Sequence, residues 1–263
     1  MYFLHYRGII VGVETIRLKR IVSFGLQGLN QLLWPAACAH CGRSVGEADK
    51  TLCTDCWGEL AVCVGGDYCR RCGRDASLYG LVDGACGDCQ GKEFYFDEIA
   101  RSGVYDNALS KMILSFKRGR TELDSMLGFL ANSALQGSGF FNEIEFFVPV
   151  PLHWSRRLFR GYNQSLVLTK ILEHPKAKIY TELVRIRRTK FQPVVASAAA
   201  RARNVAGAFA VRRGHRFAGQ SVCLVDDIKT SGATLNECAK TLKEAGASKV
   251  FALVLAVAGQ KTS

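Results

Sequence analysis

The chain lacks any run of apolar residues that is long enough to span a membrane. It also lacks the small-residue cleavage pattern that follows a basic segment in secretory signals, and its short apolar run at 8–13 is interrupted by Glu14. We therefore expect a cytoplasmic protein with no stable membrane insertion. With 263 residues, of which 48% are hydrophobic, the chain is long enough for one full α/β domain and a small appendage.

Acidic residues are scarce, and one long segment has none. The chain contains 23 Asp and Glu against 35 Lys and Arg, which gives a formal net charge of +12. No acidic residue lies between Leu183 and Val225, where nine residues are basic: Arg185, Arg187, Arg188, Lys190, Arg201, Arg203, Arg212, Arg213 and Arg216. This charge favours polyanionic partners such as sugar phosphates, nucleic acid or anionic membrane surfaces. Gln192, Ala196–Ala200 and Gly207 indicate a mobile segment that closes over a substrate as a lid.

Cysteine, by contrast, is concentrated in one segment. Nine of the eleven cysteines lie between Cys38 and Cys89. Eight of them form four Cys-x-x-Cys pairs, Cys38/Cys41, Cys53/Cys56, Cys69/Cys72 and Cys86/Cys89. Each such turn brings two thiolates onto one tetrahedral ion, and Gly42 and Gly73 suit the tight turn after two of the pairs. We predict a double zinc ribbon that binds two structural zinc ions through these eight cysteines.

Other interpretations of the cysteines are weaker. A disulfide framework is expected in secreted proteins, and a thioredoxin-like redox pair would not recur four times. Sequential pairing of the Cys-x-x-Cys turns is the simplest arrangement, and an interleaved pairing is also compatible with the spacing. The segment has too few apolar residues for a core, so zinc should supply much of its folding free energy. Cys223 and Cys238 fall on predicted core faces and are expected to pack as small apolar side chains.

Near the C-terminus, a strand, an acidic pair and a helix follow one another. Residues Ser221–Val225 form a continuous apolar run that is typical of a buried parallel strand. Asp226 and Asp227 follow at once, and apolar residues at helical spacing begin after Thr234. Thr234 with Glu237 fits a capping box. The intervening loop should therefore lie at the carboxyl end of a strand and the amino end of a helix, where open α/β sheets bind ligands.

The residue types in this loop suit a sugar phosphate. Backbone N–H groups at a helix start favour a phosphate group, glycine allows close approach, and hydroxyl groups add donors. Two adjacent carboxylates are natural acceptors for neighbouring ribose hydroxyls. An ordinary strand–turn–helix with a solvated acidic turn is the alternative, and the coincidence of all these features in order favours the site. The candidate residues are Asp226, Asp227, Thr230, Ser231, Gly232, Ala233 and Thr234.

The remaining segments predict further elements. Apolar residues in 94–105 indicate β-structure, and helices are expected at Asn107–Ser115 and near Glu122–Leu135. The run 145–151 predicts a buried strand whose following loop faces the same side of the sheet as the acidic pair. Periodic apolar residues predict an N-terminal helix at Glu14–Leu33. We expect an N-terminal helix and extension at 1–37, the double zinc ribbon at 38–92, and an α/β domain at 93–263.

These motifs, in this order, resemble the ComF-type competence proteins. The resemblance covers roughly residues 20–258 and is carried by the cysteine-rich ribbons together with 117–119, 149–152, 160–164, Thr189 with Gln192, 201–209 and 226–234. Ser231 departs from the threonine that is more usual in the family, and its hydroxyl group is retained. The fold implied is a type I phosphoribosyltransferase-like parallel sheet flanked by helices, behind a small double zinc ribbon.

The resemblance also implies a ligand and a role. In the family, the acids hold the ribose of 5-phosphoribosyl-1-pyrophosphate (PRPP) and the loop holds its 5′-phosphate, so Asp226 and Asp227 become the candidate catalytic residues. The earlier loop is expected to bind the pyrophosphate through main-chain N–H groups of the segment Pro151–Leu152–His153, with Arg156, Arg157 or Arg160 adding charge. Lys117 is a further candidate for PRPP binding. Magnesium would enter with PRPP. Single-stranded DNA and another protein of the competence machinery are the further partners implied, in DNA uptake for natural transformation.

Three functions stay open from the sequence. The first is an enzyme that displaces pyrophosphate from PRPP with an unknown nucleophile. Thr230 stands where purine-salvage relatives have a carboxylate, so salvage of hypoxanthine-type bases is not expected. The second is a nucleic-acid-binding accessory whose affinity depends on phosphate contacts, and the third is a PRPP-sensing regulator whose ribbon binds another protein.

Overall fold

The computed structural model describes residues 37–46, 51–82, 84–89, 91–120, 123–154, 161–189 and 197–259. The chain divides into two compact units, Met1–Thr54 and Asp55–Ser263. The predicted helix at Glu14–Leu33 lies outside the described residues, as do Arg156, Arg157, Arg160, Lys190 and Gln192. Among the described residues, no helix combines the length and apolar character needed to cross a membrane.

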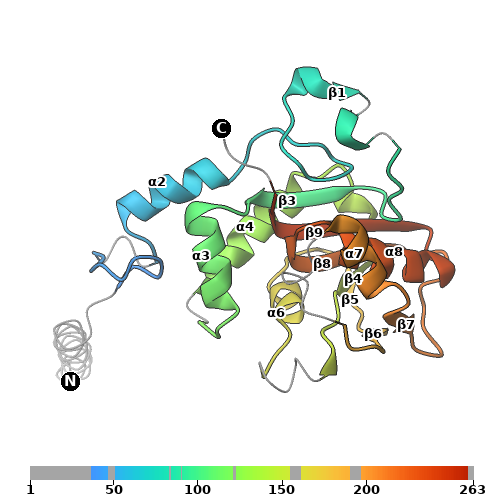
Figure 1. Ribbon diagram of the computed structural model, residues 1–263. Helices are drawn as coiled ribbons and strands as arrows, with labels where there is room; N and C mark the ends of the chain where they lie inside the picture. Colours follow the sequence, from blue (N-terminus) through green and yellow to red (C-terminus); the bar gives the residue numbers. More distant parts are fainter. Residues whose placement is uncertain are drawn as a thin grey trace, which may run out of the picture. The chain divides into compact units, whose positions relative to one another are not determined.

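A five-stranded sheet with the order β3-β9-β8-β4-β5 forms the centre of the second unit (Figure 1). Its strands are β3 (Ile99–Val104), β4 (Phe146–Pro149), β5 (Lys178–Ile179), β8 (Ser221–Lys229) and β9 (Lys249–Val257). All four neighbouring pairs of strands are parallel. In the register, Val225 of β8 lies between Pro149 of β4 and Leu253 of β9. The predicted parallel α/β sheet is confirmed.

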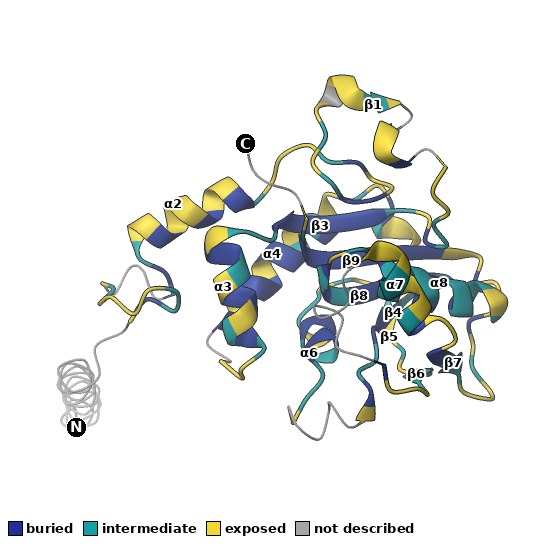
Figure 2. Ribbon diagram, in the orientation of Figure 1, coloured by how far each residue is buried: buried dark blue, intermediate teal, exposed yellow. Residues whose placement is uncertain are grey.

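Helices cover both faces of this sheet. They are α3 (Asn107–Phe116), α4 (Asp124–Gln136), α6 (Gln164–Lys170), α7 (Ala198–Val205) and α8 (Ala233–Glu244). Leu235 and Cys238 of α8 share a buried cluster with Val222 and Val250. On the opposite face, Phe251 stacks on Phe140 with ring centroids 4.4 Å apart. Side chains alternate between faces along a strand, so β9 is buried on both sides (Figure 2).

Smaller elements surround the sheet. They are α2 (Thr54–Cys63), β1 (Leu81–Val82), β2 (Ala85–Cys86), the antiparallel pair β6 (Leu183–Arg185) and β7 (Phe209–Val211), and the 3-10 helices η1 (Leu78–Gly80), η2 (Gly87–Cys89) and η4 (Phe141–Glu143). Part of the predicted lid therefore has regular structure, because α7 begins within its alanine-rich stretch. Its N-cap Ser197 accepts a hydrogen bond from the Ala200 N–H at 3.1 Å.

Several predicted elements agree with the structure and two boundaries do not. The helices expected at Asn107–Ser115 and Glu122–Leu135 correspond to α3 and α4, and Cys223 and Cys238 are fully buried as predicted. The strand predicted to end at Val225 continues to Lys229, so the acidic pair lies within β8 and the loop is short. The predicted capping box is wrong, because α8 begins at Ala233 after Gly232, one residue before Thr234.

The physical reason for the earlier helix start is the backbone of Gly232. This residue has φ of 79°, in the left-handed region that glycine adopts without strain. The turn is thus completed before Thr234 is reached. Glu237, which the capping box assigned to the helix start, instead accepts a hydrogen bond from the Gly207 N–H at 2.6 Å.

Candidate functional site

Two cysteine tetrads form candidate metal sites. The first consists of Cys38, Cys41, Cys53 and Cys56, and the second of Cys69, Cys72, Cys86 and Cys89. Within each tetrad, all four sulfur atoms lie within 4.8 Å of one another. The sequential pairing of Cys-x-x-Cys turns is therefore the one that the structure adopts. All eleven cysteines lie among the described residues and all are free thiols, which argues against the disulfide framework.

The first turn of each tetrad has the same hydrogen bonds. In the first tetrad, the Cys38 N–H donates to the Arg43 carbonyl at 2.7 Å and the Gly42 N–H donates to the Cys38 carbonyl at 2.9 Å. In the second, Cys69 and Gly73 repeat this pattern, at 2.8 Å and 2.7 Å. Both glycines have positive φ, 77° and 74°. Their predicted role in the tight turn is confirmed, because only glycine adopts this conformation readily.

The sulfur geometry fits zinc. Zn–S bonds of about 2.3 Å in a tetrahedron place the sulfur atoms about 3.8 Å apart. The distance is 3.7 Å for Cys41–Cys53, 3.5 Å for Cys69–Cys89 and 3.7 Å for Cys72–Cys86. The Cys86 N–H also donates to Cys69 Sγ at 3.2 Å, as expected for a sulfur that carries negative charge. Four thiolates in this arrangement are the donor set of a closed structural zinc site.

We expect the purified protein to contain two zinc ions per chain. Replacement of Cys41 by Ser removes a ligand of the first tetrad only, and replacement of Cys72 by Ser removes one of the second only. Each single variant should retain about one zinc ion and the double variant none, because three ligands leave the site open. Elemental analysis after dialysis measures this. One variant losing both ions would mean that the tetrads share ligands.

The candidate phosphate loop, between β8 and α8, leads directly into the first turn of α8. Ser231 Oγ accepts a hydrogen bond from the Ala233 N–H at 3.4 Å, and the Asn236 N–H closes the first helical turn onto the Gly232 carbonyl at 2.8 Å. The N–H groups of the first turn of a helix have no partner within the helix. They point toward the carboxyl edge of the sheet, together with the positive end of the helix dipole.

Asp226 is held in a polar but largely buried position. Its Oδ1 accepts hydrogen bonds from Ser165 Oγ at 2.9 Å and from the Asp227 N–H at 3.0 Å. Burial raises the pKa of Asp226 to about 7, and the neighbouring charge of Asp227 adds to this rise. The hydrogen bonds and Lys117 act in the opposite direction. An ionised Asp226 is thus costly in the ligand-free protein, and a ligand that donates hydrogen bonds to it relieves that cost.

Asp227 has a different partner. Its Oδ2 lies 3.0 Å from Lys117 Nζ, at the C-terminal end of α3, and both side chains are largely buried. Burial, together with the charge of Asp227, raises the pKa of Tyr105. The structure therefore brings the predicted Lys117 to the acidic pair, as the ion-pair partner of one carboxylate. A lysine here orients the Asp227 side chain.

The loop after β4 lies beside the acidic pair. The Val150 N–H donates to the Val225 carbonyl at 2.9 Å, so Pro151 follows directly alongside the acidic pair of β8. Proline has no N–H group, so Leu152 and His153 supply any main-chain donors here. His153 is buried, with its ring 5.4 Å from that of Trp154.

Two cavities open at this end of the sheet. One of about 420 Å³ lies beyond the β4 loop and is lined by Pro149, Pro151, Leu152, Trp154, Asn163, Leu166, Thr181, Leu183, Val184, Arg185 and Arg212. The other, of about 350 Å³, has a wall formed by Lys229, Thr230, Ser231, Gly232 and Ala233. Its opposite wall comes from the second ribbon, through Cys72, Arg74, Asp88 and Lys92. The candidate phosphate loop therefore borders a cavity lined by both polar and apolar side chains.

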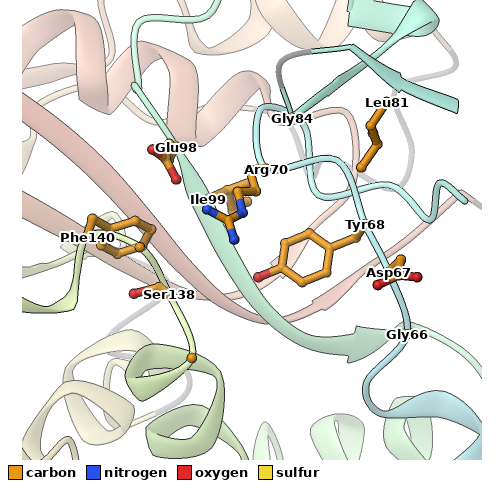
Figure 3. A pocket seen from close by; sticks show the side chains of 12 residues that line it. Gly66, Asp67, Tyr68, Arg70, Leu81, Gly84, Glu98, Ile99, Ser138 and Phe140 are labelled. Atoms are coloured by element: carbon orange, nitrogen blue, oxygen red, sulfur yellow. The ribbon is translucent and has the colours of Figure 1, made fainter. Parts of the chain in front are cut away.

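A third cavity lies away from these loops. It measures about 190 Å³ and lies between the second ribbon, the start of β3 and the segment after α4 (Figure 3). Tyr68 and Arg70 project toward it from the ribbon, and Glu98 and Phe140 line the facing side. None of the predicted site residues lines this cavity, because the start of a parallel strand is at the edge opposite to the ligand loops.

Sequence reasoning missed two side chains that the fold brings to the site. Ser165 reaches Asp226 from α6, 61 residues away in sequence, and no local pattern marks it. Lys229 lines the cavity beside the phosphate loop. The sequence could have indicated Lys229, because a lysine that follows a buried strand is rarely buried unless a group of opposite charge lies near it. Arg160, predicted for the pyrophosphate, lies outside the described residues.

The chain combines a double zinc ribbon with a parallel α/β sheet, and both parts match known domain families. Residues 29–90 match the double zinc ribbon domain family, and residues 166–263 match the phosphoribosyl transferase domain family. Competence protein F of Haemophilus influenzae is 30% identical over 220 residues, which are 81% of this chain and 93% of that protein. The chain belongs to the ComF family of competence proteins.

Two more relatives share most of the chain. Competence protein ComFC of Bacillus subtilis is 26% identical over 204 residues, which cover 75% of this chain and 80% of the relative. The DNA utilization protein YhgH of Salmonella typhimurium is 30% identical over 207 residues, which cover 74% of this chain and 88% of the relative. The family predicted from the sequence motifs is confirmed.

Proposed function

We propose that this protein binds PRPP at the carboxyl edge of its parallel sheet and acts in the uptake or processing of DNA. The observation that supports PRPP binding most directly is the junction of β8 and α8. There, two carboxylates are followed by a hydroxyl-rich loop and a helix that opens at Gly232. The support for a role with DNA comes from relatives whose names refer to competence and DNA utilization.

Each part of the ligand has chemically matched partners. Asp226 and Asp227 accept hydrogen bonds from the ribose hydroxyls, and Lys117 holds Asp227 in place. The 5′-phosphate lies on the N–H groups of Ser231–Thr234, with the hydroxyls of Thr230 and Ser231 as further donors. The pyrophosphate is held by the N–H groups of Leu152 and His153. Magnesium binds mostly to substrate oxygens and water, so few protein ligands are needed.

The same arrangement suits displacement of pyrophosphate. An acceptor nucleophile forms a bond to the anomeric carbon while the bond to the pyrophosphate oxygen breaks, and the electron pair leaves with the pyrophosphate. The positive charge that develops on the ribose lies near Asp226 and Asp227. Hydrogen-bond donors that bind the departing pyrophosphate more tightly than the diphosphate group of intact PRPP lower the activation free energy of this displacement.

Isothermal titration calorimetry with PRPP and Mg²⁺ tests this proposal on the zinc-loaded full chain. The control is the double variant Asp226→Asn with Asp227→Asn, which keeps the shape of both side chains and removes both negative charges. We expect wild type to bind and the variant to lose at least a hundredfold in affinity, because two charge-assisted hydrogen-bond acceptors are lost, each worth about 1.5–3 kcal/mol. Wild type that does not bind PRPP would refute the PRPP site.

A role with DNA predicts a separate outcome for the same two proteins. Exposed basic residues surround β6, α7 and β7: Arg187, Arg188, Arg203, Arg212, Arg213 and Arg216. Their phosphate contacts should make binding of a single-stranded oligonucleotide steeply dependent on salt. The double variant should bind the oligonucleotide as well as wild type does. Affinity that stays constant as salt rises would contradict the DNA part of the proposal.

A further inference from the structure

The second ribbon and the phosphate loop share one cavity. Arg74, Asp88, Lys92 and Glu93 line its ribbon side, where Arg74 pairs with Asp88, and Ser231 and Gly232 line its loop side. Lys229 and Cys72 line the same cavity. The metal site and the anion site of the second unit are thus neighbours. A charged side chain in this cavity therefore interacts electrostatically with both the metal site and the anion site.

Pairing with β9 holds the backbone of Lys229 in place. Lys229 is the last residue of β8 and lies opposite Val257 of β9, and its carbonyl accepts a hydrogen bond from the Ala258 N–H at 2.8 Å. Its side chain is also constrained, because the residue is only 5% exposed. The lysine therefore has little freedom to move its ammonium group into solvent.

The side chain of Lys229 folds back against Gly232. A Cβ atom built on Gly232 would lie 2.9 Å from Lys229 Cε and 3.5 Å from Nζ. Gly232 is the residue whose left-handed backbone opens α8. The absence of a side chain at Gly232 thus serves two purposes, since it permits the turn and leaves room for the lysine. The ammonium group therefore lies close to Gly232, in the loop proposed to bind the phosphate.

The charges around Lys229 come from the second tetrad. Among the described residues, no carboxylate lies within ion-pair distance of its Nζ. Burial lowers the pKa of Lys229, the Cys72 thiol raises it, and Arg74 lowers it. Cys69 and Cys89 act in the same direction as Cys72. Four thiolates around one Zn²⁺ carry a net double negative charge, which an adjacent ammonium group offsets.

We propose that Lys229 is a phosphate-binding residue of the β8–α8 loop and that the zinc-loaded second ribbon holds its ammonium group in place. This inference rests on the proposed PRPP site and adds one donor to it. A buried ammonium group is costly unless anions lie near it. The tetrathiolate is one such anion, and a phosphate monoester on the loop is a second one. The ribbon is then a structural part of the ligand site, because its tetrathiolate positions this cation.

The test compares Lys229→Met with Lys240→Met in the full, zinc-loaded chain. Methionine keeps the length of the lysine stem and removes the charge. Lys240 lies on α8 outside the cavity, with its side chain 43% exposed, so its variant controls for net charge. Affinities for PRPP with Mg²⁺ and for inorganic phosphate are measured by calorimetry. The rate of zinc transfer to a chromophoric chelator is measured separately.

We expect Lys229→Met to weaken binding of both anions about tenfold to a hundredfold, as for loss of a charged hydrogen bond, and to release one of the two zinc ions faster. Lys240→Met should match wild type in both measurements. If Lys229→Met binds PRPP as wild type does, this inference fails and the PRPP site stands. If zinc release is unchanged, the role of the ribbon fails. Wild type that binds neither anion overturns the proposed function as well.

Folding is checked by thermal unfolding of each variant. Should Lys229→Met not fold, Lys229→Gln replaces it, because glutamine is shorter and keeps a polar end in the cavity. The same two measurements then apply. A glutamine variant that binds PRPP as tightly as wild type overturns the inference in the same way.

Discussion

Replacement of Asp226 by Asn should stabilise the ligand-free protein at pH 8 while it weakens PRPP binding. The Asp226 carboxyl group is largely buried beside Asp227, and burial raises its pKa to about 7. Because this pKa lies above that of the unfolded chain, ionisation of Asp226 removes stability as pH rises from about 4 to about 7. Asparagine is neutral at every pH. Its amide oxygen still accepts from Ser165 and from the Asp227 N–H, as Asp226 does.

The size of this effect depends on pH. We expect the variant to gain about 1–3 kcal/mol at pH 8 and almost nothing at pH 4, because one pKa unit corresponds to about 1.4 kcal/mol. The charged groups that face Asp226 are Asp227 and Lys117. Burial and Asp226 itself raise the pKa of the Cys238 thiol on α8, so this thiol is neutral. Urea denaturation of both proteins across this pH range provides the measurement.

A matched variant tests the cause. Ser165→Ala removes the hydroxyl that favours the ionised carboxylate, so it should lose stability at pH 8 and lose less at pH 4. Asp226→Asn should also weaken PRPP binding by at least tenfold, because a charged acceptor for a ribose hydroxyl is lost. A variant that is less stable than wild type at pH 8 would show that ionised Asp226 stabilises the fold, contrary to this account.

Replacement of Asp75 by Ala should strongly destabilise the second unit. Arg101 of β3 has a fully buried side chain, and its guanidinium pairs with Asp75 of the second ribbon. The same guanidinium lies 4.9 Å from the centre of the Tyr68 ring. Removal of the carboxylate leaves the buried guanidinium without this anion. Because the Asp75 side chain is itself 42% exposed, we expect a cost of about 1–3 kcal/mol, below that of a pair buried on both sides. Urea denaturation of the zinc-loaded chain measures it.

The control is Asp88→Ala in the same ribbon. Asp88 pairs with Arg74 at 2.8 Å, but both side chains are well exposed, at 64% and 43%. Exposed ion pairs contribute about 0–1 kcal/mol, so this variant should remain close to wild type. The double variant Asp75→Ala with Arg101→Met should recover much of the lost stability, because it leaves no unpaired charge. If Asp75→Ala and Asp88→Ala lower the free energy of unfolding equally, the ion pair between Arg101 and Asp75 does not stabilise the packing of the second ribbon against β3.

Local features of this protein were predictable because short-range physical chemistry determines them. The Cys-x-x-Cys turns followed by Gly42 and Gly73 are specified within a few residues, and the structure has them as expected. Apolar periodicity located α3 and α4 within a few residues. Such elements depend on the backbone and on which face is apolar. The start of α8 was misplaced, because Thr234 and Glu237 fitted a cap that the left-handed backbone of Gly232 made unnecessary.

The candidate site was predictable only in part. The sequence located the two acids and the hydroxyl loop, because they lie together in one motif. It did not distinguish the acids from each other. In the structure, Asp226 accepts from Ser165 and Asp227 pairs with Lys117, so the two carboxylates have different surroundings. Those surroundings come from α6 and α3, which no pattern around the motif specifies.

By itself, then, the sequence determined the zinc-ribbon cysteines, the parallel sheet and the candidate loop after the acidic pair, since each depends on residue spacing along the chain. Only the tertiary structure decided which cysteines share an ion, which partner each acid has, and that Lys229 and Cys72 line one cavity with the loop. The physical reason is burial. The electrostatic environment of a side chain is set by the groups packed around it, and those groups come from distant parts of the chain.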